Sequence, residues 1–195
     1  METKILITGF EELDKYLAED DIIEFYSEQS IALDIIYHRV LALLAPVNLI
    51  IVGVRGGFDP LIFRTFCRIF NRNNVNLYIQ RAFKAEDIEP TLLESKNSLP
   101  LVIYNPYGYR RLYARIVSAI KNSRSKVLIF SPIDRKKNGS TLGAHVAHSI
   151  IELKEAKNGI KARIIKSVTT GPITFEFTKG MIYYNLRQKS LLDWI

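Results

Sequence analysis

The sequence is poor in cysteine: its 195 residues include only one, Cys67. A single thiol excludes a disulfide within the chain and any zinc site built on paired thiolates. Cys67 lies among Phe63, Phe66 and Phe70, so we interpret it as a buried apolar residue.

Long hydrophobic runs are also missing. No apolar stretch approaches the roughly 18 residues that suggest a membrane helix. The apolar segment in the first ten residues is too short for a signal peptide. We therefore expect a cytoplasmic protein with no membrane contact.

The composition is that of a globular protein, and the charge is distributed unevenly along the chain. Hydrophobic residues make up 48% and charged residues 24% of the sequence, and the length suits one domain over residues 1–195. Residues 1–34 carry a net charge of −8, and the remainder carries +15. A basic body favours a polyanionic partner such as nucleic acid, although a solvated surface rich in lysine and arginine is the plainer interpretation.

Apolar runs alternate with amphipathic segments along most of the chain. Asp59 followed by Pro60 marks a helix start, and Pro90 is expected to interrupt or restart a later helix. The expected strands cover residues 22–26, 47–54, 75–80, 99–105 and 126–131, and the expected helices 10–17, 31–44, 58–73, 84–95 and 109–124. This alternation predicts an α/β fold with a mainly parallel sheet covered on both faces. Three short runs at 147–156, 160–168 and 173–179 predict antiparallel hairpins.

Five strings, taken in order, resemble one family. They are TGFEELDKYL, IIEFYSE, GVRGGFDPLIF, YIQRAF and LGAHVAHSIIELKEAKNGIKARIIKS. Together they resemble the RecA-type ATPase core of archaeal RadA recombinases and their paralogues, over nearly the whole chain. The resemblance implies a RecA-like core with a C-terminal antiparallel hairpin extension. The family's N-terminal helix-hairpin-helix domain and its polymerisation linker have no counterpart here, so we expect no RadA-like filament.

The resemblance also implies where a nucleotide site would lie. A phosphate-binding loop needs glycines, a lysine and a Ser or Thr that holds Mg²⁺. The matched positions hold Ser27, Ser30 and Ala32 for the glycines, Leu33 for the lysine, Asp34 for the Mg²⁺ ligand, Arg55 for the catalytic glutamate and Asn105 for the Walker B aspartate. Because all of these roles are lost together, we expect a pseudo-ATPase with no cofactor and no metal.

An acid–base pair and three histidines remain to be interpreted. Asp34 and Arg55 are expected to lie close together, and either they pair to fill the vacant site or they reflect drift. His145 and His148 lack the additional ligands that a metal site needs. His38 falls on a predicted helix and is interpreted as structural.

Two loops resemble those that line the DNA path in recombinases. The first, residues 106–113, interleaves three tyrosines with two arginines, and the second, residues 132–144, is basic and contains glycine. Stacking on bases and contacts to phosphate would involve Tyr107, Tyr109, Arg110 and Arg111 in the first loop and Arg135, Lys136 and Lys137 in the second. The plainer alternatives are tyrosines that cap a helix and a solvated run of charge.

The resemblance implies an accessory factor in homologous recombination and DNA repair. Such a factor would bind single-stranded DNA and modulate the RadA recombinase, another RadA paralogue or a junction-processing enzyme. The alternative is a non-catalytic structural subunit that pairs with an ATP-competent paralogue without contacting DNA itself. A third hypothesis is an unorthodox nucleotide enzyme. The ending SLLDWI, which contains the only tryptophan, Trp194, either folds back on the core or anchors a partner.

Overall fold

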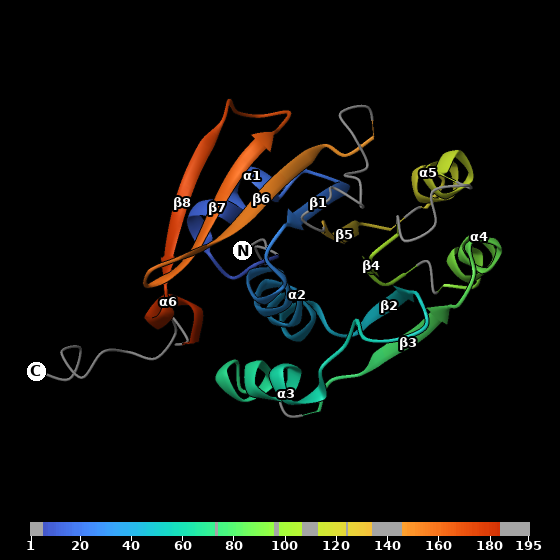
Figure 1. The fold of residues 1–195 in the computed structure, drawn as a ribbon, viewed down its shortest axis with the longest axis horizontal. Coiled ribbons are helices and arrows are strands. Elements are labelled where there is room, and N and C mark those ends of the chain that lie inside the picture. Colours follow the sequence, from blue (N-terminus) through green and yellow to red (C-terminus); the bar gives the residue numbers. More distant parts are fainter. Residues whose placement is uncertain are drawn as a thin grey trace, which may run out of the picture.

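In the part of the chain that the structure describes, eight strands form one sheet in the order β3-β2-β4-β5-β1-β6-β7-β8 (Figure 1). The structure is a computed structural model, and it describes residues 6–72, 74–95, 98–106, 113–123, 125–133 and 146–183. The strands are β1 (Ile22–Ser27), β2 (Val47–Val52), β3 (Leu77–Ala82), β4 (Leu101–Tyr104), β5 (Val127–Pro132), β6 (Ser149–Ala156), β7 (Gly159–Lys166) and β8 (Ile173–Thr178). The helices are α1 (Glu11–Leu17), α2 (Ser30–Leu44), α3 (Pro60–Ile69), α4 (Ala85–Glu94), α5 (Tyr113–Lys121) and α6 (Lys179–Tyr183).

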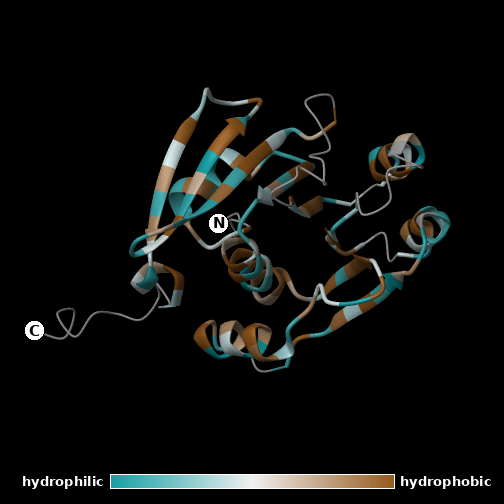
Figure 2. Ribbon diagram, in the orientation of Figure 1, coloured by the Kyte–Doolittle hydropathy of each residue, from teal (hydrophilic) through white to brown (hydrophobic). Residues whose placement is uncertain are grey.

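Most of the sheet is parallel. The six strands from β3 to β6 in the spatial order all pair in parallel, whereas β7 and β8 add antiparallel hairpins at one side. Central strands such as β2 and β5 carry hydrophobic residues along most of their length (Figure 2). Continuous apolar strands are typical of sheets that are covered on both faces. The predicted parallel core with an antiparallel extension is therefore confirmed.

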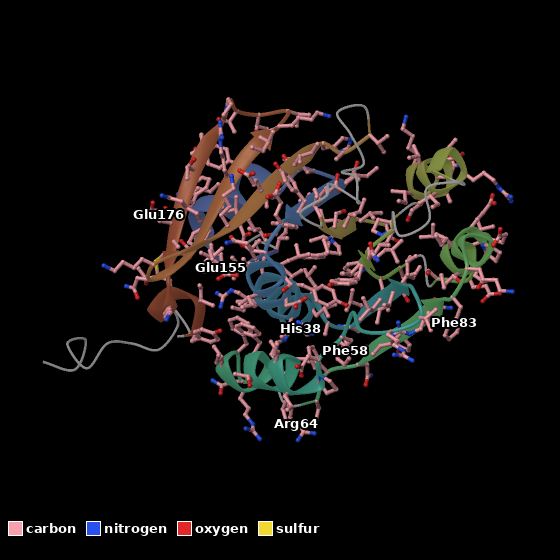
Figure 3. The ribbon with its side chains drawn as sticks, viewed as in Figure 1. His38, Phe58, Arg64, Phe83, Glu155 and Glu176 are labelled. Atoms are coloured by element: carbon pink, nitrogen blue, oxygen red, sulfur yellow. The ribbon has the colours of Figure 1, made fainter. Side chains whose placement is uncertain are left out.

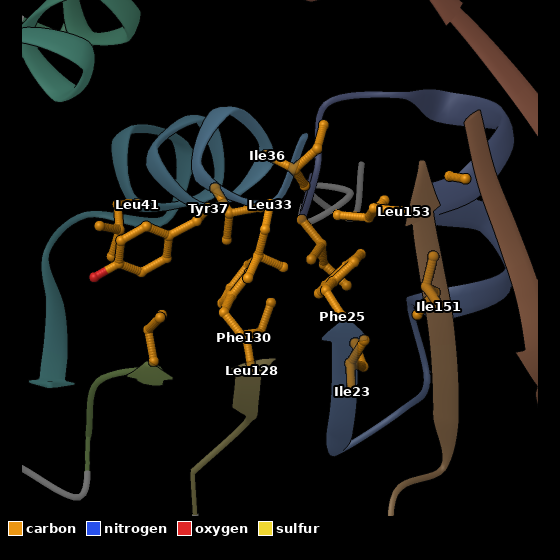
Figure 4. Packing of buried hydrophobic residues seen from close by; sticks show 14 of the residues in the cluster. Ile23, Phe25, Leu33, Ile36, Tyr37, Leu41, Leu128, Phe130, Ile151 and Leu153 are labelled. Carbon is orange, nitrogen blue, oxygen red and sulfur yellow. The ribbon is translucent and has the colours of Figure 1, made fainter. Parts of the chain in front are cut away.

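Helices cover both faces of the sheet. One buried cluster joins α1, α2 and α3 to one face, and a second cluster joins α4 and α5 to the other. In Figure 4, Leu33 and Tyr37 point from α2 toward Phe25 and Phe130 on the sheet. These side chains are completely buried. The helix α2 is thus fixed against the centre of the sheet, directly after β1.

Local signals explain where two of the helices begin and continue. At the start of α3, the Asp59 side chain accepts hydrogen bonds from Leu61 N (2.8 Å) and Ile62 N (3.3 Å), as the Asp-Pro signal predicts. The expected interruption at Pro90 is wrong, because α4 runs through it. Pro90 removes one backbone N–H from the helix, and the remaining bonds and the buried Ile88 and Leu92 keep the segment helical.

A buried arginine joins the first and last described segments. The Arg39 guanidinium donates to Thr8 O (2.7 Å) and to Ile182 O, and it lies 4.3 Å from the Phe10 ring centroid and 4.8 Å from that of Phe70. Burial lowers the pKa of Arg39 to about 10, so the side chain stays protonated at neutral pH. Backbone carbonyls and aromatic faces contact the guanidinium, and the nearby negative charge of Asp14 opposes the lowering of its pKa.

In the segment TGFEELD, residues 8–14, one carboxylate bonds the first residues to the last. Asp14 accepts hydrogen bonds from Thr8 N (2.8 Å), Thr8 Oγ1 (2.7 Å) and Gly9 N (2.9 Å). Burial raises the pKa of Asp14, and the bonds from Thr8 and Gly9 oppose that rise. These bonds hold the chain before α1 against the helix itself, because Asp14 lies in α1. In the described part of the chain, no helix has the length and apolar character to cross a membrane.

Candidate functional site

The carboxyl ends of β1, β2, β4 and β5 meet at one edge of the sheet, because these strands are parallel. Ligands of open α/β sheets bind at this edge. The residues matched to a nucleotide site all lie along it, at the end of β1, at the start of α2 or just after β2 and β4. They are Ser27, Ser30, Ala32, Leu33, Asp34, Arg55 and Asn105.

The turn between β1 and α2 is short and docked onto β6. Only Glu28 and Gln29 separate the strand from the helix. Ser27 is buried, and its Oγ donates to Leu153 O (2.7 Å) and accepts from Gln29 N (3.0 Å). The Gln29 side chain accepts from Glu155 N (2.6 Å). The polar groups of this turn are therefore engaged by the turn itself and by β6.

The helix α2 already includes the positions where the resemblance places the remaining loop residues. It begins at Ser30, so Ala32 and Leu33 are helical. Both side chains have no exposed surface and belong to the core. A lysine that neutralises phosphate must reach outward from its loop, whereas Leu33 points into the interior (Figure 4). The local geometry is that of an ordinary strand-to-helix turn.

Asp34 is half-buried and contacts a tyrosine from β4. The Tyr104 hydroxyl donates to Asp34 Oδ1 at 3.4 Å. Burial raises the pKa of Asp34, the hydrogen bond from Tyr104 opposes the rise, and the negative charge of Asp59 adds to it. Burial and the Asp34 charge in turn raise the pKa of Tyr104 well above its usual value. Two carboxylates, Asp34 and Asp59, thus lie near each other at this edge.

Asp34 and Arg55 do not form the ion pair that was one of the two interpretations of these residues. Both residues lie in the described part of the chain, and no ion pair joins them there. Arg55 is exposed in the loop after β2, whereas Asp34 faces Tyr104. Of the two interpretations of these substitutions, drift is consistent with this geometry.

A different arginine holds the loop after β2. Arg81 of β3 donates from Nη1 to Gly53 O and from Nη2 to Gly56 O, both at 2.9 Å. The Tyr37 hydroxyl donates to Gly57 O at 2.8 Å. Gly57 has a φ of 79°, and a Cβ there would lie 2.5 Å from Ile51 Cγ2. The sequence string YIQRAF contained Arg81, but nothing in its pattern indicated this contact.

His38 is structural, as expected. Its Nε2 accepts from Asp59 N (2.8 Å), so Nδ1 carries the proton and donates to Asp34 O (2.7 Å). The ring packs near Phe58, with 5.5 Å between the centroids (Figure 3). Burial lowers the pKa of His38, while the bond to the Asp34 carbonyl and the Asp59 charge oppose this shift. The neutral ring links α2 to the start of α3.

Asn105, which the resemblance matches to the Walker B aspartate, directly follows β4. Its φ of 56° is unusual for a residue other than glycine, and asparagine tolerates this conformation better than most. Asn105 N donates to Phe130 O at 2.8 Å. The backbone therefore turns away from the sheet at this point while it stays bonded to β5.

The predicted DNA contacts lie outside the described residues. They are Tyr107, Tyr109, Arg110, Arg111, Arg135, Lys136 and Lys137. The structure does place the strands that precede them: β4 and β5 are neighbours, and Ile133 N bonds to Ser27 O at 2.9 Å. Both segments thus leave the sheet at the edge that carries Ser27.

Metal ligands are sparse in what the structure describes: no group of three or more His, Cys, Asp or Glu residues there could hold an ion. His148 accepts from Asp21 N (3.0 Å) through Nδ1, at the opposite edge of the sheet. His145 lies outside the described residues.

Comparison with known proteins identifies the fold. No protein-family model matches the sequence, and neither does any curated protein. Solved structures do match. A DnaB-like replicative helicase, solved with a view to its interactions with primase, has a TM-score of 0.61 at 13% identity, covering 92% of this chain and 63% of the helicase chain.

Two further structures are similar over nearly their whole length. The RadB recombinase has a TM-score of 0.58 at 11% identity, covering 89% of this chain and 96% of its own. A KaiC-like protein from the hyperthermophilic archaeon Pyrococcus horikoshii has a TM-score of 0.51 at 13% identity, covering 92% of each chain. At such low identities these likenesses show the fold alone, which is RecA-like and confirms the predicted fold class.

Proposed function

We propose that this chain is an ATPase-deficient RadA paralogue that serves as a non-catalytic accessory factor in homologous recombination and DNA repair. The observation that carries the proposal is the burial of Leu33 in a helix that begins at Ser30. A phosphate-wrapping loop presents a curved run of backbone N–H groups and an outward lysine. Here the corresponding segment is helical, and its side chains fill the core.

The charges at the edge support the same proposal. A triphosphate and its Mg²⁺ need positive charge and open carboxylate or hydroxyl ligands. Asp34 is half-buried and bonded to Tyr104, and Asp59 accepts the backbone N–H groups of α3. Two negative groups without a lysine repel a polyanion. The loss of the phosphate-binding groups and the unfavourable charge therefore both oppose nucleotide binding.

Nucleotide binding tests the first half of the proposal. A ligand that binds the native state stabilises it by RT ln(1 + [L]/Kd), about 4 kcal/mol at a thousandfold excess over Kd. We expect ATP with Mg²⁺ to leave the unfolding temperature unchanged at millimolar concentration. Calorimetry that finds micromolar affinity for ATP would overturn the pseudo-ATPase assignment.

The distribution of charge supports a nucleic-acid partner. The chain after residue 34 carries a net charge of +15, and the two predicted DNA loops leave the sheet from the adjacent strands β4 and β5. Phosphate contacts from such loops would bind single-stranded DNA without regard to sequence. We propose that the bound strand, or a contact beside it, is how the protein modulates the RadA recombinase or another paralogue.

A salt series tests the second half. Log affinity for single strands falls with log salt by about 0.7 for each neutralised phosphate. Replacing Arg135, Lys136 and Lys137 together with alanine should flatten this slope by up to about 2, equally for different base sequences. The matched control replaces Arg64, Arg68 and Lys121, three exposed cations on α3 and α5, and should change the slope less.

The stacking residue gives a second, separable signal. Replacing Tyr109 with alanine should lower affinity by about 1–3 kcal/mol while the slope stays constant, because stacking releases no counterions. Fluorescence anisotropy with labelled oligonucleotides measures both effects. If the wild-type chain binds no single strand at low salt, the structural-subunit hypothesis replaces the accessory DNA binder.

A further inference from the structure

A groove lies between the first turn of α2, the β6–β7 hairpin and α6. Its volume is about 340 Å³. Its apolar lining comes from all three elements and consists of Ile31, Ala32, Ile35, Ala156, Ile160, Ile182 and Tyr183. In Figure 1, α6 lies below the ends of β7 and β8 and beside α2, and in Figure 3 Glu155 marks the hairpin above them.

The groove exposes side chains that a folded protein normally covers. Ile31 is 60% exposed and Tyr183 is 40% exposed, although their neighbours Ala32, Ile160 and Ile182 are buried. Single exposed apolar residues need no explanation, but a grouped set around a groove marks a binding surface. Ile31 also lies in the first turn of α2, next to the positions that the resemblance matches to a nucleotide site.

The rim of the groove is positively charged. Lys157 of the hairpin turn and Lys179 of α6 are exposed, and neither forms an ion pair within the part of the chain that the structure describes. Glu155 is the one acidic residue in the lining. The groove therefore suits an apolar segment that carries a negative charge.

We propose that the chain's own segment 184–195 docks in this groove, with Trp194 as the anchor. The segment follows Tyr183, which itself lines the groove. Its last five residues, Leu191-Leu192-Asp193-Trp194-Ile195, are four apolar residues around one acid, and they follow the basic Arg187 and Lys189. Residues 191–195 are therefore the part that matches an apolar floor beside two lysines. This inference does not depend on the proposed function.

The length of the segment permits this docking. Trp194 lies eleven residues beyond Tyr183, and a chain of that length spans at most about 36 Å when extended. It can therefore turn back into a groove at which it starts. Closing so short a loop is entropically cheap, and the linkage keeps the effective concentration of the segment high. Docking within one chain is thus favoured over docking in a second copy.

Trp194 supplies the test, because it is the only tryptophan in the sequence. In the full chain, we expect its fluorescence to be blue-shifted relative to indole in water and protected from the neutral quencher acrylamide. Ile31→Asp places a carboxylate in the groove opposite Asp193. It should shift the emission to longer wavelength and raise the quenching constant several-fold.

Controls separate docking from unfolding. Leu61→Asp changes another exposed apolar residue in the first turn of a helix, α3, away from the groove, and should leave the emission unchanged. Far-UV circular dichroism should show that both variants remain folded. Replacing Lys157 and Lys179 with glutamate alters only exposed rim charges and should also loosen Trp194.

Three results would each overturn the proposal. They are a wild-type emission equal to that of indole in water, a buried emission that Ile31→Asp leaves unchanged, and a blue shift that disappears on dilution. The last result would assign the groove to a second copy of the chain.

Discussion

Leu33 offers the most direct test of how the start of α2 is built. The resemblance matches this position to a phosphate-binding lysine, yet the Leu33 side chain has no exposed surface and packs in the core cluster. Replacing a buried leucine with alanine costs about 2–5 kcal/mol, because transfer energy is lost and a cavity remains. For a chain of this length, each kcal/mol lowers the unfolding temperature by about 2–4 °C. A loss of about 3 kcal/mol therefore predicts a decrease of roughly 6–12 °C for Leu33→Ala.

The matched control is Leu61→Ala. Leu61 also lies in the first turn of a helix, but it is 74% exposed, so its truncation should change stability by less than about 0.5 kcal/mol. Urea unfolding followed by circular dichroism compares the two variants. Equal and small effects would mean that residue 33 faces solvent, and the reasoning from burial would be refuted. Leu33→Lys gives a second outcome: it should destabilise the protein further without bringing ATP binding.

Three other predictions follow from contacts at the same edge and in the core. In a double-mutant cycle, Asp34→Asn and Arg55→Gln should be additive within about 0.5 kcal/mol, whereas Asp34→Asn and Tyr104→Phe should couple, because only the second pair is in contact. Burial lowers the pKa of His38, so below about pH 6.5 the unfolded chain binds a proton that the folded chain excludes, and stability falls as pH drops from about 6.5 toward the lowered pKa. Unfolding curves between about pH 7 and pH 5 should show that His38→Gln removes this part of the decline; an unchanged slope would contradict the assignment. Arg39→Lys should cost about 2–4 kcal/mol in urea unfolding, because one ammonium cannot reach the carbonyls on both sides, while Arg55→Lys should cost less than about 0.5 kcal/mol.

The sequence predicted those parts of the fold that local patterns determine. Continuous apolar runs marked β2 and β5, and Asp59 before Pro60 marked the start of α3. The predicted interruption at Pro90 was wrong because the packing of the rest of α4 outweighs the one missing backbone N–H. The helix α6 has five residues, too few for a periodic pattern to show.

Local sequence patterns could not predict contacts between segments that lie far apart in the sequence. Tyr104 meets Asp34 across 70 positions, and Arg81 reaches Gly53 across 28. The order of the strands decides such meetings: β3 flanks β2, which brings Arg81 to the loop after β2, and β4 lies under α2, which brings Tyr104 to Asp34. The positions matched to a nucleotide site could be located at the sheet edge from resemblance. Which partner each of these side chains contacts could be learned only from the three-dimensional arrangement.

The Arg39 clamp has a mechanical consequence. One guanidinium on α2 holds both Thr8, before the first helix, and Ile182, in the last described helix. A force that pulls these two segments apart would load the hydrogen bonds of Arg39 before it reached the ladder of the sheet. Single-molecule stretching between points near residues 8 and 182 should therefore show an early, low-force release that Arg39→Lys weakens. The helix α2 would then carry the first mechanical load between the two ends of the described chain.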